Sequence, residues 1–155
     1  MMMSAATALA ADWVQIYLDD NDNLIYFDPD RVTVTSQTGD NVEFAAQFRM
    51  VYSDKGRNAL IDWYREYSIM PRGIENLSYD VATIQFKRDG ENRYYRIIER
   101  VSYTANGTNL SDMHYVNPNG AWEKISVGSV VDVEYYEALL IVEGKLYKRI
   151  DSENL

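Results

Sequence analysis

The chain has 155 residues, of which 46% are apolar and 25% are charged, and this balance fits one globular domain with its own core. The formal net charge of −9 argues against nucleic acid or an anionic membrane surface as a partner, because both repel an acidic protein. Cysteine is absent, which excludes disulfide bonds, a cysteine nucleophile and cysteine-based metal sites.

The first twelve residues combine a short apolar run with a cleavage-like pattern. Ala8-Leu9-Ala10 fits the A-x-A motif that precedes a signal-peptidase cut, although no Lys or Arg comes before Arg31. The run is shorter than the roughly 20 apolar residues that span a bilayer. We therefore expect residues 1–10 to be the remnant of a signal peptide, no transmembrane segment, and a mature protein outside the cytoplasm. A frayed, alanine-rich end of a cytosolic protein is the alternative interpretation.

A period of two dominates the chain up to residue 52. It predicts strands at 12–18, 24–27, 31–36 and 42–52, with a tight turn or a single helical turn at 28–30. The last of these strands has the clearest alternation, and its apolar face consists of Val42, Phe44, Ala46, Phe48, Met50 and Tyr52.

The period then changes, which predicts a helix over residues 57–67. Its apolar stripe has the i, i+3, i+4, i+7 spacing of a helix and consists of Leu60, Trp63, Tyr64 and Tyr67. Strands are expected again at 79–88 and 93–104, joined by a hairpin turn. Shorter strands are expected at 114–116 and 121–125.

A second helix is predicted to begin at Ser129. Ser129-x-x-Asp132 resembles a capping box, and Gly144 is a suitable residue at which the helix can end. The apolar stripe consists of Val131, Tyr135, Ala138, Leu139 and Val142. Residues 145–155 are expected to form a loosely ordered tail. The sequence thus predicts a single α+β domain over residues 11–144, an antiparallel sheet with a mid-chain helix and a C-terminal helix packed on one face.

Four segments occur in an order typical of one family. They are Trp13, Tyr26-Phe27-Asp28-Pro29, Tyr103-Thr104-Ala105-Asn106-Gly107 and Trp122-Glu123-Lys124-Ile125 with Ser129. In this order the chain resembles surface-adhesin protein E-like domains, which are small exported bacterial domains. The resemblance implies an antiparallel sheet with a C-terminal helix, and a location outside the cytoplasm. Members commonly carry a Cys pair that ties the sheet to the final helix, which this chain lacks, and the helix at 57–67 looks like an extension.

Three patterns could bind a metal or carry chemistry, and each has a simpler interpretation. Asp19-x-Asn21-x-Asn23 with Asp30 partly fits a calcium loop, but the flanking strands favour a solvated hairpin turn. His114 is the single histidine and is expected to be half-exposed on a strand or loop.

Glu134 and Glu137 could in principle act as paired carboxylates. Their spacing of three residues is more typical of the solvated face of a helix, where we expect them to lie. The sequence indicates no catalytic residue, metal site or cofactor.

A cluster of tyrosine and arginine lies on the strand predicted at 93–104. Alternation places Tyr94, Arg96 and Arg100 on the face opposite Tyr95 and Ile97. These residue types dominate binding hot spots, so the three are predicted to bind a partner. Cross-strand pairing of the arginines with carboxylates and tyrosine rings is the alternative.

Two function classes follow. The favoured one is a non-enzymatic interaction module at the cell surface or in the periplasm that binds a protein or an envelope component through a sheet face. It predicts a large Tyr/Arg patch and no cleft lined by acids or metals. The alternative is a small exported ligand-binding protein or a hydrolase with an unrecognised carboxylate site. It predicts a concave pocket with converging polar groups and a shifted pKa at one of four carboxylates, Asp19, Asp28, Glu99 or Glu134.

Overall fold

The structure is a computed structural model that describes residues 12–153, with the backbone alone for 145–153. The expected signal-peptide remnant, residues 1–10, lies outside the described residues.

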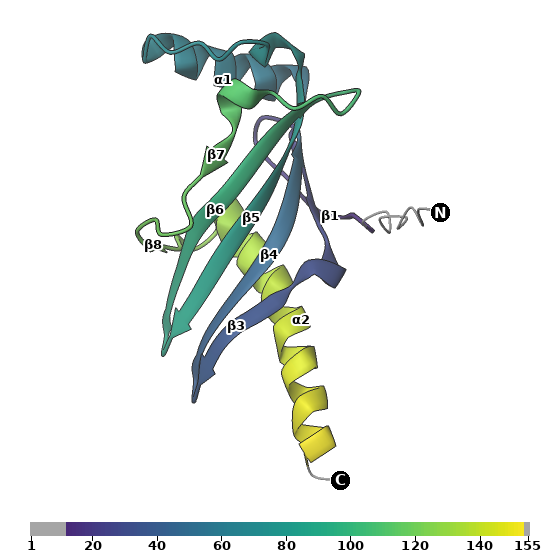
Figure 1. The fold of residues 1–155 in the computed structure, drawn as a ribbon, viewed down its shortest axis with the longest axis vertical. Coiled ribbons are helices and arrows are strands. Elements are labelled where there is room, and N and C mark those ends of the chain that lie inside the picture. Colours follow the sequence, from purple (N-terminus) through teal and green to yellow (C-terminus); the bar gives the residue numbers. More distant parts are fainter. Residues whose placement is uncertain (1–11, 154–155) are drawn as a thin grey trace, which may run out of the picture.

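Within residues 12–153, eight strands form one antiparallel sheet (Figure 1). They are β1 (Val14–Leu18), β2 (Leu24–Phe27), β3 (Thr33–Thr38), β4 (Asn41–Val51), β5 (Leu77–Asp89), β6 (Asn92–Thr104), β7 (Tyr115–Val116) and β8 (Glu123–Lys124). The order is β1-β2-β4-β5-β6-β7, while β3 pairs with the first half of β4 and β8 pairs with β6. The predicted α+β class with an antiparallel sheet is confirmed.

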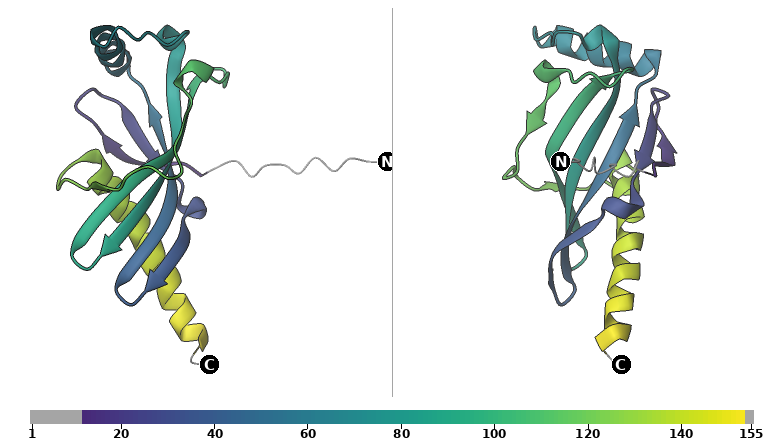
Figure 2. Two further views of the ribbon diagram at one scale, coloured as in Figure 1. Left: turned by 60° about the vertical axis from the view of Figure 1, so that its left-hand side comes forward. Right: turned by 45° about the vertical axis from the view of Figure 1, so that its right-hand side comes forward.

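Two helices accompany the sheet in the described residues, α1 (Asp54–Glu66) and α2 (Val130–Glu153). Single 3-10 turns lie at Pro29–Arg31, Ile74–Asn76 and Ser111–Met113. Figure 2 shows α2 lying along one face of the sheet, whereas α1 lies across the end where β4 finishes and β5 begins. We call the face under α2 the inner face and the opposite one the outer face. Among the described residues, no helix has the length and hydropathy needed to cross a membrane.

The core lies between the inner face and α2. Phe44 packs with its ring centroid 5.3 Å from Phe86 and 5.7 Å from Tyr135, so the helix and two strands meet at one aromatic cluster. Burying a side chain of this size contributes about 1.5–3 kcal/mol. The buried cluster consists of Phe27, Val32, Val42, Phe44, Ala46, Phe48, Ile84, Phe86, Ile125, Tyr135, Ala138, Leu139 and Val142. The alternation predicted for β4 and the stripe predicted for the second helix are therefore confirmed.

Side chains cap the start of α2 as the sequence predicts. The backbone N–H of Asp132 donates to Ser129 Oγ over 3.2 Å, and the Asp132 carboxylate accepts from the N–H of Gly128 over 2.8 Å. Arg93 on β6 also pairs with this carboxylate, which ties the helix start to the sheet.

The far end of α2 differs from the expectation. The helix continues through Gly144 to Glu153, so residues 145–153 are helical and the predicted end at Gly144 is wrong. Gly144 does not adopt the positive φ of a C-terminal glycine cap. A glycine inside a helix costs about 1 kcal/mol relative to alanine, which is too little to end a helix flanked by strong helix-forming residues.

The start of α1 is held by the turn between β1 and β2. Ser53 caps the helix by accepting from Gly56 N–H over 2.8 Å, and Asn23 Oδ1 accepts from Ser53 N–H over 3.0 Å. Gly56 lies so close to the Asn23 amide that a Cβ there would be 1.9 Å from its oxygen. The helix therefore begins three residues before the predicted Arg57, where these contacts satisfy its first N–H groups.

Candidate functional site

A cavity of about 260 Å³ lies between the start of α2 and the inner face of β4, β5 and β6. We call it the α2 cavity. Its lining consists of Phe48, Met50, Tyr52, Asp80, Ala82, Ile84, Ile97, Arg100, Val130, Val131 and Glu134. Most of these side chains are apolar, and four are ionisable, so polar groups converge inside a largely hydrophobic wall.

The four ionisable residues of the α2 cavity come from four different elements. Tyr52 follows β4, Asp80 lies on β5, Arg100 on β6 and Glu134 on α2. The Tyr52 hydroxyl donates to Asp80 Oδ2 over 2.6 Å, and Arg100 Nε lies 3.9 Å from the same oxygen. We call these four residues the polar cluster.

Glu134 is the most unusual member of the polar cluster. It is 6% exposed, and no side chain in the described part of the chain makes a hydrogen bond with its carboxyl group. Burial raises the pKa of Glu134 to about 8, and the positive charge of Arg100 offsets only part of this rise. At neutral pH most Glu134 carboxyl groups are therefore protonated.

This position corrects the expectation that Glu134 lies on the solvated face of α2. Glu134 is buried because it follows Val131 by three residues and precedes Ala138 by four, so it lies beside the apolar stripe. Glu137, its expected partner, is only partly buried.

Asp80 also has an acceptor that is not used. Its carboxylate is 4% exposed, and its Oδ1 atom is buried without a hydrogen-bond partner among the described residues. An unpaired acceptor of this kind costs about 1–3 kcal/mol unless a donor reaches it. Burial and the neighbouring Asp80 carboxylate together raise the pKa of Tyr52, so its hydroxyl stays protonated as the donor to Asp80.

A β-bulge decides where Arg100 points. Ile84 pairs with Ile97, but the preceding Thr83 pairs with Glu99, so Ile98 is an extra residue in β6. The register pairs Arg100 with Ala82, which lines the α2 cavity. Arg100 therefore lies on the inner face with Ile97, and its predicted place beside Arg96 on the opposite face is wrong.

Tyr94 and Arg96 lie on the outer face, as predicted, and both are engaged by neighbours. Arg96 donates to Gln85 Oε1 over 2.8 Å and to the Gly120 carbonyl over 3.2 Å, and its guanidinium lies 4.4 Å from the centre of the Trp122 ring. Arg96 therefore has a structural role on the sheet, as the alternative interpretation predicts. Its partners, however, are an amide, a carbonyl and an indole rather than carboxylates and tyrosine rings. Binding of a partner by Tyr94, Arg96 and Arg100 stays a prediction.

The remaining candidate residues, Asp19, Asp28 and His114, each contact other residues of the protein. The Asp19 carboxylate accepts from the N–H of Asn21 and from the N–H and amide of Asn23, as in a solvated turn. Asp28 is buried and caps the turn Pro29–Arg31 by accepting from Asp30 N–H over 3.0 Å. His114 Nε2 lies 3.7 Å from Glu99 Oε2, and both side chains are partly exposed.

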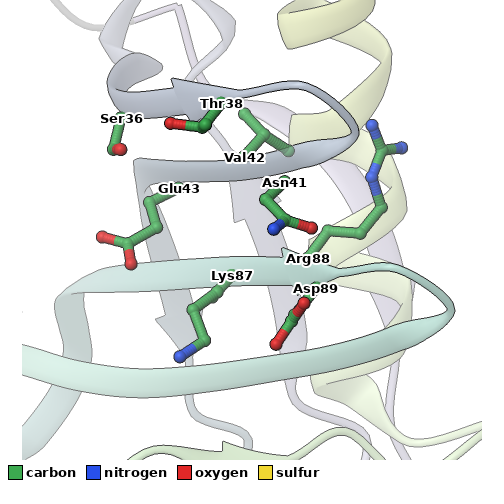
Figure 3. Close-up of a pocket in the computed structure, with 8 residues that line it drawn as sticks. All are labelled: Ser36, Thr38, Asn41, Val42, Glu43, Lys87, Arg88 and Asp89. Carbon is green, nitrogen blue, oxygen red and sulfur yellow. The ribbon is translucent and has the colours of Figure 1, made fainter.

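A second hollow, of about 190 Å³, lies between the β3–β4 and β5–β6 hairpins (Figure 3). Its polar groups join the hairpins to each other. Asn41 Oδ1 accepts from Gly90 N–H over 3.1 Å, and Arg88 Nε donates to the Asp40 carbonyl over 3.2 Å. Figure 3 shows Arg88 pointing away from Glu43 and Lys87, so the charged groups do not converge there.

Sequence reasoning named Arg100 and Glu134 but did not bring them together, and it missed Tyr52 and Asp80 as site residues. Asp80 was detectable in part, because it is a carboxylate at an inward position followed on the same side by the apolar Ala82, Ile84 and Phe86. Comparison of the chain with family models, with curated proteins and with solved structures finds no match.

Proposed function

We propose that this protein is a non-enzymatic binding protein for a small organic molecule, and that the molecule occupies the α2 cavity. The Asp80 Oδ1 atom, which is buried in the α2 cavity without a hydrogen-bond partner among the described residues, carries this proposal. A buried polar group without a partner is costly, and a ligand that supplies the partner regains that free energy on binding.

The surroundings of the polar cluster favour binding over catalysis. Tyr52 is the candidate nucleophile closest to a carboxylate, but its raised pKa keeps the phenol protonated near neutral pH. The other wall residues are mostly aliphatic or aromatic, so they can pack against a ligand but have no group that takes part in a reaction.

The contacts on the outer face weaken the case for the interaction module that the sequence favoured. That module needs free hydrogen-bond donors on an exposed Tyr/Arg patch, whereas Arg96 directs its donors to Gln85 and Gly120. The alternative of a small exported ligand-binding protein needs a pocket with converging polar groups and a carboxylate of shifted pKa. Glu134 in the α2 cavity supports that alternative.

Protein recognition is retained as a second candidate function because of one surface at the end of α1. Trp63, Tyr67, Ile69 and Met70 are each about half exposed there. Apolar clusters of this kind are common at interaction sites. A photo-crosslinking amino acid at position 63 tests this function in the producing cell, with position 58 on the same helix as control. One defined adduct from position 63 alone supports it, and equal labelling from both positions contradicts it.

We further propose that the protein acts outside the cytoplasm. The Ala8-Leu9-Ala10 motif, the lack of cysteine and the resemblance to exported domains support this location. Mass spectrometry of the protein recovered from its native cell tests it. A chain that begins at Ala11 is expected, and a chain that retains residues 1–10 in the cytoplasmic fraction would contradict the proposal.

Binding in the α2 cavity is testable with methionine-methyl NMR. Met50 lines the cavity, whereas Met70 and Met113 do not. A fragment library is expected to contain compounds that shift the Met50 methyl signal and leave the other two unchanged. Ala82→Leu fills the cavity and is expected to abolish these shifts, and Val131→Phe serves as a second filling variant if the first unfolds. Shifts at Met50 that persist in a folded filled variant, or no shift with any fragment, would overturn the proposed function.

A further inference from the structure

Arg100 separates two hollows of the molecule. On one side lies the α2 cavity, and on the other lies a hollow of about 240 Å³ beneath the segment that carries β7 and β8. Both hollows are lined by Ile97 and Arg100. The 240 Å³ hollow is otherwise lined by Tyr95, Arg96, Tyr115, Asn117, Gly120, Ala121 and Glu123. A ligand in the α2 cavity can therefore contact the guanidinium, which lines both hollows.

The Arg100 guanidinium has donors to offer. It makes no hydrogen bond within the described residues, since its nearest acidic atom, Asp80 Oδ2, lies at 3.9 Å from Nε. Its side chain is 44% exposed, so it is open to a ligand as well as to water. A planar guanidinium with free donors is suited to a carboxylate, which it binds through two parallel hydrogen bonds.

The acceptors lie deeper in the α2 cavity. Asp80 Oδ1 is buried without a partner among the described residues, and the Glu134 carboxyl group is buried without a hydrogen bond from them. Asp80 accepts through its carboxylate, a protonated Glu134 still accepts through its carbonyl oxygen, and an ammonium group has three donors to give. The inner end of the cavity is therefore suited to a protonated amine.

The charges of the polar cluster favour a ligand that carries both signs. Asp80 is negative and Arg100 positive, while most Glu134 carboxyl groups are neutral near pH 7, so the cluster has almost no net charge. A singly charged ligand that binds between Asp80 and Arg100 would replace their pairing for only one of the two, and leave the other without a partner in a partly desolvated site.

The rest of the wall is apolar. Side chains from the sheet and from α2 surround the remaining space, namely Phe48, Met50, Ala82, Ile84, Ile97, Val130 and Val131. A ligand that fills this space therefore needs a hydrocarbon body.

We infer that the ligand is a small zwitterion with an apolar body, of the class of the free aliphatic and aromatic α-amino acids. Its ammonium group binds Asp80 and Glu134, its carboxylate binds Arg100, and its side chain packs against the apolar wall. This assignment rests on the proposed binding function and names the chemistry of its ligand.

Calorimetric titration with matched compounds tests the assignment. The probes are leucine, 3-methylbutylamine, which lacks the carboxylate, and 4-methylpentanoate, which lacks the amine. The corresponding triplets for valine, methionine and phenylalanine vary the body. One amino acid is expected to bind about tenfold or more tightly than both of its singly charged relatives, because each lost charge-assisted contact costs about that factor.

The outcomes separate the two proposals. If an amine or an acid binds as tightly as its amino acid, the zwitterion assignment is overturned, but binding in the α2 cavity stands. If none of the probes binds, the assignment is also overturned, and the fragment experiment on Met50 decides the proposed function by itself.

Two variants test which residue binds which charged group of the ligand. Arg100→Gln is expected to weaken amino acid binding about tenfold or more and to leave amine binding unchanged. Glu134→Leu removes the acceptor and is expected to weaken both. Arg49→Gln on the outer face is the matched control and should change neither. Equal loss of amine and amino acid binding in Arg100→Gln would contradict the proposed orientation.

Discussion

The two faces of the sheet use their charged residues in opposite ways. On the outer face, Arg96 is accessible but its donors are directed to Gln85 and Gly120. On the inner face, Glu134 is buried but has no hydrogen bond from a described side chain. A partly exposed side chain can thus be chemically satisfied while a buried atom such as Asp80 Oδ1 has no hydrogen-bond partner among the described residues. Availability for binding follows from unused donors and acceptors, and exposure alone is a poor guide to it.

The largest difference between the faces is expected in packing energy. Phe86 on the inner face is fully buried and touches the rings of Phe44, Phe48 and Tyr135. Phe86→Ala is expected to lower the free energy of unfolding by about 3–5 kcal/mol. Val81→Ala on the outer face of the same strand should cost about 1 kcal/mol or less, since Val81 is only partly buried. Urea unfolding followed by circular dichroism measures both, and equal losses would remove the contrast.

The next effect is the pH dependence that Glu134 gives to stability. Its pKa is about 8 in the folded protein and near 4.5 in the unfolded chain, so the folded state binds more protons between these values. Stability is therefore expected to fall as pH rises from about 4.5 to about 8, and to change little from this group outside that window.

Glu134→Gln is expected to remove this slope and to leave the variant more stable than the wild type at pH 8. Glu143→Gln, at an exposed position of the same helix, is the control and should keep the slope. Thermal unfolding at pH 5, 6, 7 and 8 provides the measurement. A wild-type protein with the same slope as Glu134→Gln would show that Glu134 is solvated.

A smaller effect is expected where Trp122 covers the outer-face cations. Its ring centre lies 4.4 Å from the Arg96 guanidinium and 5.0 Å from Lys87 Nζ. Trp122→Ala is expected to cost about 1–2 kcal/mol, because two cation–π contacts are lost. Trp122→Phe keeps an aromatic ring and should recover about half of the loss. If the alanine variant is as stable as the wild type in urea, the Trp122 ring does not stabilise the outer face through these cations.

The smallest effect is expected for the exposed contact between Glu99 and His114. Glu99 and His114 lie 3.7 Å apart with both side chains partly exposed. Glu99→Gln is expected to change stability by less than about 0.5 kcal/mol, because solvent screens such pairs. Measurement in low and high salt checks this. A loss as large as that from a buried carboxylate would mean that the two faces do not differ as described.

Much of the fold follows from the sequence because its periods are clear. The alternation from Val42 to Tyr52 and the stripe from Val131 to Val142 predict the two surfaces that form the core. The site was harder to predict, since its members are single polar residues at inward positions of apolar patterns. Alternation also fails at Ile98, because a bulge changes which residues face inward and leaves no signal in the spacing of polar and apolar residues.

The extra residue at Ile98 has a genetic consequence. A bulge can absorb the loss of one codon: without Ile98, Glu99 would still pair with Thr83 and Arg100 with Ala82, so Arg100 would keep its inward face. A lineage could thus shorten β6 by one residue at this point and still keep the positive charge at the α2 cavity. In comparing related genes, a one-residue difference in length here therefore does not by itself mean that the arginine has changed faces.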